Sequence, residues 1–241
     1  MNRKQQGFTL VELTIAVAFL SVLLMAILTI SLMAGKLYIK GDTNKTVNQA
    51  ARDFSDVVRR DFLSTGTGII TIPEPVNAGT VTNPLLSGRA CLGNVTYLWN
   101  SAALLNDTSD AAREARIVYD TTSQPIRFVR ISQPKYKYCD KDPVTDKYPV
   151  RIVGSEVTTE LLGGTGREYA LHSITITALA TNGDRGMYQI AYTMGTNEEG
   201  TLERDDTGTI ICKPNNSVAA NFDYCSVNDF DMIVRVGGAQ K

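Results

Sequence analysis

The chain has 241 residues, of which 43% are hydrophobic and 20% charged, ordinary proportions for a folded protein with one large domain or two small ones. Its formal net charge is -1, but residues 1–63 carry eight Lys and Arg against five Asp and Glu, whereas residues 64–241 carry sixteen against twenty. This mildly acidic bulk argues against a nucleic-acid-binding protein, because such domains usually show a strong basic excess, and leaves only a local basic patch open.

Residues 13–34 form the longest apolar run in the chain, with 22 residues and no charge. As a helix this run would be about 33 Å long, which matches the thickness of the hydrocarbon core of a bilayer. A buried core helix is the alternative, although a soluble domain rarely contains an uncharged run of this length. A cleaved secretory signal fits less well, because the run exceeds the usual apolar region and no small-residue cleavage pattern follows it. The sequence therefore predicts one membrane-spanning helix.

The residues that precede this run form a recognisable motif. A short basic leader ends in Gly7, and Phe-Thr-Leu-Val-Glu-Leu follows before about twenty apolar residues. This arrangement resembles the class III signal of type IV pilins and pseudopilins. The resemblance implies that a prepilin peptidase cuts between Gly7 and Phe8 and methylates the new amine of Phe8, and that Glu12 is the glutamate used in assembly.

Glu12 is a carboxylate near the start of a segment expected to lie in lipid. An intramembrane carboxylate costs about 2.5–3.5 kcal/mol on insertion scales, so such groups are normally paired and functional. After cleavage the amine of Phe8 would lie one helical turn away, either in the same chain or in a neighbouring subunit. A pair between subunits would fix the stagger of adjacent helices. The alternative is a carboxylate that reaches the interface without a partner.

The helix is expected to continue beyond the membrane as an amphipathic segment. Apolar residues recur at three- and four-residue spacing at Val47, Phe54 and Phe62, with charged residues between them, and the polar run from Ser64 ends the pattern. A continuous helix over residues 8–63 would be about 84 Å long, with Gly41 as a weak point. We therefore divide the chain into a leader (1–7), a membrane or filament-core helix (8–35), an amphipathic half (36–64) and a head (65–241).

Residues 65–241 are expected to be rich in antiparallel strands, which gives an α+β fold with the sheet packed on the amphipathic half of the helix. Residues 169–180 and 186–194 flank an Asn-Gly turn and predict a hairpin. Residues 116–120 and 126–131 predict a second hairpin, and residues 208–212 and 230–236 predict further strands. Residues 107–116 suggest a short helix, and residues 85–106 show no clear pattern.

The four cysteines all lie in this head, without CxxC pairs and with one histidine in the chain, so a zinc site is not expected. An even count outside the cytoplasm fits two disulfides, for which three connectivities are available. We favour the pairs Cys212–Cys225 and Cys91–Cys139; four buried free thiols are the alternative.

Catalytic patterns are absent from the sequence. His172 is the single histidine and shares the face of an alternating run with apolar residues, which is typical of a core position. GxSxG, HExxH and P-loop motifs do not occur. The acidic residues at 140, 142 and 146 alternate with lysines and lack the glycine and glutamate of a calcium loop. No enzyme activity, cofactor or metal is expected.

One cluster of cations and aromatics could bind single-stranded nucleic acid or glycans. The plainer interpretation is an exposed strand edge and loop. Its members are Arg127, Arg130, Lys135, Tyr136, Lys137 and Tyr138.

Taken with the resemblance, these features predict a structural subunit, and the large head resembles that of a minor pilin of a type IV pilus-like filament. The alternatives are a minor pseudopilin of a type II secretion system, or a membrane-tethered adhesin or DNA-binding module that works alone. The implied partners are other pilin subunits, prepilin peptidase, the membrane, and the assembly platform and ATPase of the machinery. The implied location is the cytoplasmic membrane in a single pass, then an extracellular pilus or periplasmic pseudopilus.

Overall fold

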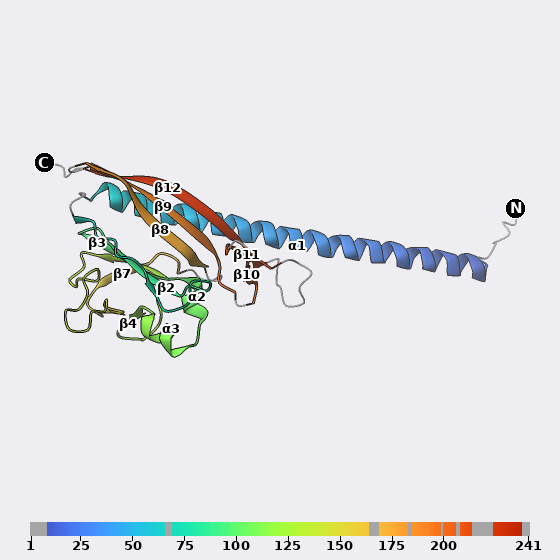
Figure 1. Cartoon of the computed structure of the whole chain (residues 1–241). Coiled ribbons are helices and arrows are strands. Elements are labelled where there is room, and N and C mark those ends of the chain that lie inside the picture. The colour runs from blue at the N-terminus through green and yellow to red at the C-terminus, as the bar shows by residue number, and fades with distance from the viewer. Residues whose placement is uncertain are drawn as a thin grey trace.

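A single long helix, α1 (Leu10–Leu63), spans the length of the molecule and carries the β-rich head at one end (Figure 1). The computed structural model describes residues 9–65, 69–163, 169–182, 185–198, 200–205, 208–213 and 224–237. With 54 residues, α1 is about 81 Å long. Its N-cap is Thr9, whose side chain accepts a hydrogen bond from the backbone N–H of Glu12, and its C-cap is Ser64. The helix contains no proline and continues through Gly41, so the expected weak point does not interrupt it.

The head is built from two antiparallel sheets that meet the second half of α1. The larger sheet has the strand order β1-β2-β3-β5-β7, and the smaller one has the order β12-β9-β8. Two short pairs, β10–β11 and the parallel pair β4–β6, lie outside these sheets. The strands are β1 (Val76–Asn77), β2 (Leu86–Cys91), β3 (Val95–Asn100), β4 (Val118–Tyr119), β5 (Phe128–Ser132), β6 (Arg151–Ile152), β7 (Val157–Glu160), β8 (Tyr169–Asn182), β9 (Arg185–Thr196), β10 (Leu202–Arg204), β11 (Ile210–Cys212) and β12 (Val227–Val236).

Two short helices, α2 (Ala102–Asn106) and α3 (Asp110–Ala115), follow β3. Each begins with a serine whose hydroxyl accepts a backbone N–H from the first turn: Ser101 for α2 and Ser109 for α3. The helix expected over residues 107–116 is therefore present as α3, shorter at both ends.

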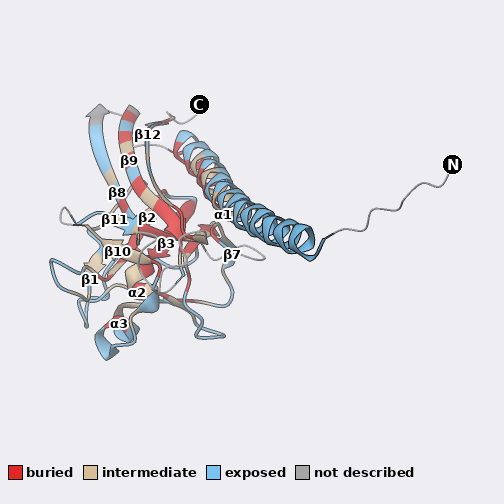
Figure 2. Ribbon diagram, turned by 90° about the vertical axis from the view of Figure 1, so that its right-hand side faces the viewer, coloured by how far each residue is buried: buried red, intermediate tan, exposed pale blue. Residues whose placement is uncertain are grey.

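The main hydrophobic core joins α1 to both sheets (Figure 2). Phe54 of α1 makes edge-on ring contacts with Phe128 of β5 and Tyr192 of β9, at centroid distances of 4.8 and 4.9 Å. Phe62 and Val58 belong to the same cluster. A fully buried aromatic contributes several kcal/mol to folding, so these contacts attach the head to the helix.

The hairpin expected over residues 169–194 is confirmed, since β8 and β9 pair antiparallel up to Asn182 and Arg185. Residues 183–184 of its turn lie outside the described residues. The hairpin expected between residues 116–120 and 126–131 is confirmed only next to its turn, where Val118 and Pro125 form an antiparallel bridge and the N–H of Tyr119 donates to the carbonyl of Gln124. Beyond this short ladder the strands have other partners, because β4 pairs with β6 and β5 pairs with β3 and β7. Local alternation of apolar and polar residues predicts that a segment is a strand, whereas packing in the core determines which strand it pairs with.

Strands β2 and β3 lie in the segment that showed no clear pattern. All six residues of β3 are buried, because one face packs on the main core and the other on a second cluster with residues such as Leu98 and Ile126. A strand buried on both faces does not alternate, and this removes the period-two signal.

Candidate functional site

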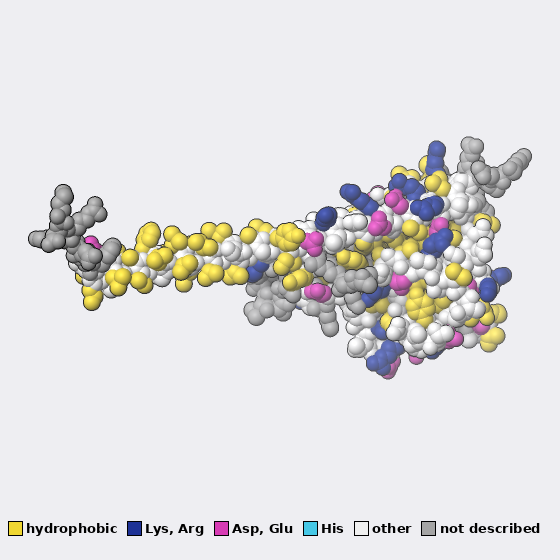
Figure 3. Space-filling model, turned by 180° about the vertical axis from the view of Figure 1, so that it is seen from behind, with side chains coloured by type: hydrophobic (Ala, Val, Ile, Leu, Met, Phe, Trp, Pro, Cys, Tyr) yellow, Lys and Arg dark blue, Asp and Glu magenta, His cyan; other side chains and the backbone are white. Residues whose placement is uncertain are grey.

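The first half of α1 is not buried against the head. From Leu10 to Tyr38 its large apolar side chains are exposed on every face, and we call residues 10–38 the apolar stalk. Figure 3 shows this hydrophobic surface running along the helix up to the head. Within the described residues, α1 is the one helix long and apolar enough to cross a membrane. A helix that is apolar all round requires lipid or protein around it.

The stalk begins with a reciprocal cap between Thr9 and Glu12. The backbone N–H and the hydroxyl of Thr9 donate to Oε2 of Glu12 at 3.0 and 2.9 Å, while the N–H of Glu12 donates to the Thr9 hydroxyl at 3.3 Å. This is a capping box, in which two backbone donors at the helix start are satisfied by side chains. Thr9 was missed as a functional residue, although the Thr-x-x-Glu pattern that signals such a cap is visible in the sequence.

The cap also orients the carboxylate. In the described part of the chain, both hydrogen bonds from Thr9 end on Oε2 of Glu12, which leaves Oε1 for another donor. Gly7 and Phe8, the residues expected to flank the cleavage site and to carry the methyl group, lie outside the described residues.

The second half of α1 is docked on the head, and we call residues 43–62 the docked half. Its buried residues recur at helical spacing: Thr43, Val47, Ala51, Phe54, Val58, Asp61 and Phe62. Tyr192 of β9 reinforces this contact, because its hydroxyl donates to the carbonyl of Ala51 at 2.9 Å. The amphipathic pattern therefore predicts the docked surface correctly, except that one buried residue on this surface is charged.

That charged member, Asp61, is the centre of a buried polar network. Nε of Arg130 lies 2.6 Å from Oδ2 of Asp61, and Nη2 lies 2.9 Å from Oδ1, so the pair is bidentate. The hydroxyl of Tyr97 also donates to Asp61. Burial, together with the neighbouring Asp61 carboxylate, raises the pKa of Tyr97, and the hydrogen bond to Asp61 raises the pKa of Arg130. The network joins the end of α1 to β3 and β5.

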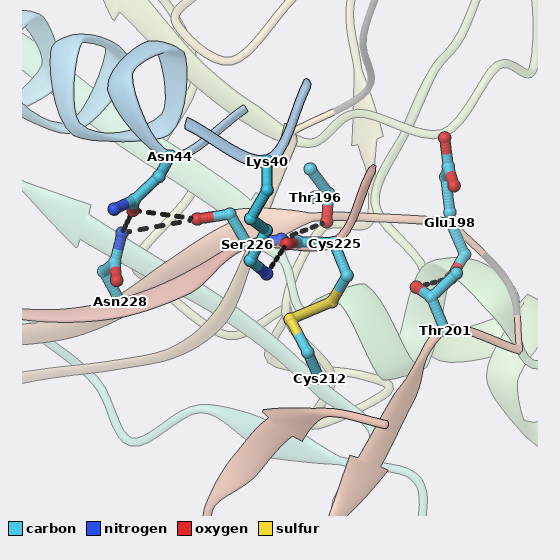
Figure 4. Close-up of a disulfide and its surroundings, with 9 residues drawn as sticks. All are labelled: Lys40, Asn44, Thr196, Glu198, Thr201, Cys212, Cys225, Ser226 and Asn228. Carbon is cyan, nitrogen blue, oxygen red and sulfur yellow. Dashed lines mark hydrogen bonds between the residues drawn. A yellow bond between two sulfur atoms is a disulfide. The ribbon is translucent and has the colours of Figure 1, made fainter. Parts of the chain in front are cut away.

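A second polar contact ties α1 to the start of β12, beside a disulfide (Figure 4). Nζ of Lys40 donates to the carbonyl of Cys225 at 2.5 Å. Oδ1 of Asn44 accepts from the hydroxyl of Ser226 at 3.2 Å and from the amide of Asn228 at 2.9 Å. These bonds hold the beginning of β12 against the helix just beyond the apolar stalk.

Two disulfides close the head, Cys91–Cys139 and Cys212–Cys225. They close loops with sequence separations of 48 and 13 residues. Such crosslinks stabilise mainly by limiting the unfolded chain, by about 4 and 3 kcal/mol respectively in the chain-entropy model.

The cation and aromatic cluster at residues 127–138 does not form one continuous binding surface. Arg130 is bound to Asp61, and Tyr138 is buried with its hydroxyl accepting the N–H of Val153. Lys135, Tyr136 and Lys137 remain exposed on a loop. The cluster is divided because Arg130 lies on β5 and is bound to the docked half, whereas residues 135–138 lie in the loop after that strand.

His172 is buried in β8, and burial lowers its pKa to about 4, so it is neutral at physiological pH. Its Nε2 has no hydrogen-bond partner in the described part of the chain. Asp142 accepts the backbone N–H groups of Val144 and Thr145 and so shapes its own turn; these bonds lower its pKa. Among the described residues, no three potential metal ligands come together.

The fold and the stalk together define a class: a β-rich head docked on a helix that leaves the head as an apolar rod. Comparison with known proteins narrows this class. Residues 2–34 match the family model of the prokaryotic N-terminal methylation motif, so the chain carries the class III signal of type IV pilins and pseudopilins. No curated protein and no solved structure matches the chain. The motif supports a pilin-like or pseudopilin-like precursor, and the apolar helix that follows its start fits a membrane anchor.

Proposed function

We propose that this protein is a minor pilin, a structural subunit that enters a type IV pilus-like filament through the apolar stalk. One observation carries the proposal: residues 10–38, most of which belong to the methylation motif matched at residues 2–34, are exposed on every face in the single chain. A membrane would cover this surface before assembly, and the stalks of neighbouring subunits would cover it afterwards.

Processing would prepare the stalk for this exchange. A prepilin peptidase cuts between Gly7 and Phe8 and methylates Phe8, so that an ammonium group appears immediately before Thr9. Glu12, oriented by Thr9 through Oε2, offers Oε1 to the ammonium of its own chain or of a neighbour. A pair between neighbours sets the axial offset of one stalk against the next, because an unpaired charge would be left in an apolar environment at any other offset.

The precursor would sit in the cytoplasmic membrane in a single pass with its leader inside, and the head would face outward in the extracellular filament. A separate ATPase and an assembly platform would supply the energy, and we propose no enzyme activity or cofactor for this chain. The large head with its two disulfides fits a subunit of low copy number or near the tip better than a repeating shaft subunit.

A minor pseudopilin of a type II secretion system, acting in the periplasm, is the nearest alternative, because it would use the same signal and stalk. A tethered adhesin or DNA-binding module that works alone is a different class. It would not require Glu12, since a helix that only anchors the head needs no offset from a neighbour.

Mass spectrometry of filaments sheared from cells tests the proposal. We expect a chain that begins with N-methyl-Phe8 in the filament fraction, and its absence from that fraction in a cleavage-blocked Gly7→Val variant. A protein found only in the membrane fraction and beginning at Met1 would overturn the proposal. A processed chain confined to a periplasmic secretion complex would favour the pseudopilin.

A further inference from the structure

Arg89, in the middle of β2, is a buried cation whose partners in the described structure are all neutral. The residue is 1% exposed. Its Nη1 donates to the carbonyl oxygens of Tyr138 and Pro149 at 3.0 and 3.1 Å, and its guanidinium carbon lies 4.4 Å from the centre of the Tyr148 ring. Its Nη2 is buried without an acceptor.

This arrangement is costly unless an anion completes it. A buried guanidinium normally pairs with a carboxylate, as Arg130 does with Asp61 in the same head. Burial lowers the pKa of Arg89 to about 10, which leaves it protonated at neutral pH. Within the described residues, Arg89 has a full charge and an unsatisfied donor, and no carboxylate forms an ion pair with its guanidinium.

A cavity of about 650 Å³ lies beside Arg89, a volume typical of sites for small ligands. Its walls come from the segment before β2, from α3 and from the loop over residues 141–150. Val76, Ala115 and Val150 supply apolar surface, and Tyr148, whose ring lies against the guanidinium of Arg89, also lines the cavity.

The lining of this cavity carries equal numbers of positive and negative side chains, and this limits the kind of ligand that it can bind. Arg89, Lys141 and Lys147 face three carboxylates in the lining, those of Glu74, Glu114 and Asp146. A polyanion such as DNA would meet repulsion from these acids. A single carboxylate with hydroxyl groups would instead satisfy both sides, because the acids accept hydrogen bonds from hydroxyls while a planar carboxylate suits the guanidinium.

We propose that this cavity, the Arg89 pocket, binds a small monocarboxylate that carries hydroxyl groups, of which a sugar acid is the simplest example. The carboxylate accepts from the Nη2 of Arg89, and the body of the ligand lies along the apolar wall. Because Nη2 is buried, the side chains of Tyr148 and Lys141 shift to admit the ligand. Lys141 is held there by Asp146 through bonds of 3.1 and 3.2 Å on the exposed loop, which is compatible with such a shift.

Binding of glucuronate to the processed full-length protein in detergent micelles tests this inference, with neutral glucose and inorganic phosphate as comparison probes. We expect saturable binding of glucuronate by titration calorimetry or ligand-observed NMR, and none of glucose. Arg89→Met should weaken glucuronate binding by about tenfold or more.

Arg89 is buried, so a second pair of variants keeps the test independent of its packing. Ala111→Trp places a large side chain in the cavity from an exposed position of α3 and should abolish binding. Arg113→Trp places the same side chain on the same helix outside the lining and should leave binding unchanged.

Three results would overturn the proposal: no saturable glucuronate binding by the wild type, glucuronate binding that survives Ala111→Trp, or phosphate binding as tight as that of glucuronate. None of these results bears on incorporation into filaments, so the proposed function stands or falls separately.

Discussion

The two halves of α1 share one continuous helix but differ in where their partners lie. The docked half buries Val47, Phe54, Val58 and Phe62 against the head, whereas the stalk exposes residues such as Phe19 almost as fully as in an isolated helix. The docked half therefore stabilises the fold of this chain. The apolar surface of the stalk is not buried when the chain folds, so its burial can stabilise only a complex with lipid or with other proteins. The same helical pattern serves folding at one end and association at the other.

The same substitution in each half should separate these roles most strongly. Phe54→Ala removes a core ring and should lower the free energy of unfolding of the head by about 3–5 kcal/mol. Phe19→Ala should change it by less than about 0.5 kcal/mol, because this ring contacts nothing in the head. Urea unfolding of the full chain in detergent micelles measures both, with Trp99, the single tryptophan, as a buried fluorescent reporter. Equal losses in the two variants would contradict the division.

The next largest expected loss of unfolding free energy comes from breaking the ion pair between Asp61, at the end of the docked half, and Arg130. Arg130→Met leaves Asp61 buried without its cation and should cost about 3 kcal/mol of unfolding free energy. Arg60→Met, on the solvent face of the same helical turn, is the matched control and should cost less than about 0.5 kcal/mol. A loss from Arg130→Met as small as that of the control would show that the network contributes little.

The head should also lose stability in mild acid through His172. Its folded pKa of about 4 lies below the ordinary value near 6.5, so the unfolded chain binds more protons between these two values. The stability that this residue contributes is complete above pH 6.5 and falls as the pH drops, by about 2 kcal/mol between pH 7 and pH 5.

His172→Gln isolates this contribution, since it removes the titrating group and keeps a polar side chain. The difference between wild type and variant should change with pH by the stated amount in urea unfolding at pH 7 and pH 5. A difference that stays constant with pH would argue against a buried neutral histidine.

The smallest expected effect concerns the start of the stalk. Thr9→Ala removes the hydroxyl that caps the helix and should destabilise its first turn by about 1 kcal/mol. Hydrogen exchange of the Glu12 amide in micelles should become faster by about fivefold, while Thr14→Ala, whose hydroxyl bonds within the helix to Val11, should leave it unchanged. Unchanged exchange in the Thr9 variant would mean that Thr9 does not order the turn.

The sequence predicts most of the helical half of this molecule and little of the head's topology. Local patterns predict the stalk, the docked half and the β8–β9 hairpin. The spacing of apolar residues, the distribution of charge and an Asn-Gly turn can all be read from residues that are close in sequence. Local patterns do not predict the partners of β5, because strand pairing depends on burial among segments that are far apart in the chain.

The polar sites show the same limit. The sequence offered Arg130 either as part of a binding surface or as part of an exposed strand edge, because both depend on its neighbours in sequence, but its partner, Asp61, lies 69 residues earlier. Arg89 gave no sequence signal at all, because its burial depends on a strand without alternation. Thr9, by contrast, was readable from its spacing to Glu12.

The claim that everything else depends on is that Glu12 sets how stalks pack after processing. Quantifying subunits in sheared filaments for Glu12→Leu, with Thr29→Leu as a control that changes polarity without charge, tests it most directly. We predict that cleavage at Gly7 proceeds in both variants but that Glu12→Leu is depleted from filaments by tenfold or more, whereas Thr29→Leu enters normally. Equal incorporation of wild type and Glu12→Leu would contradict the account.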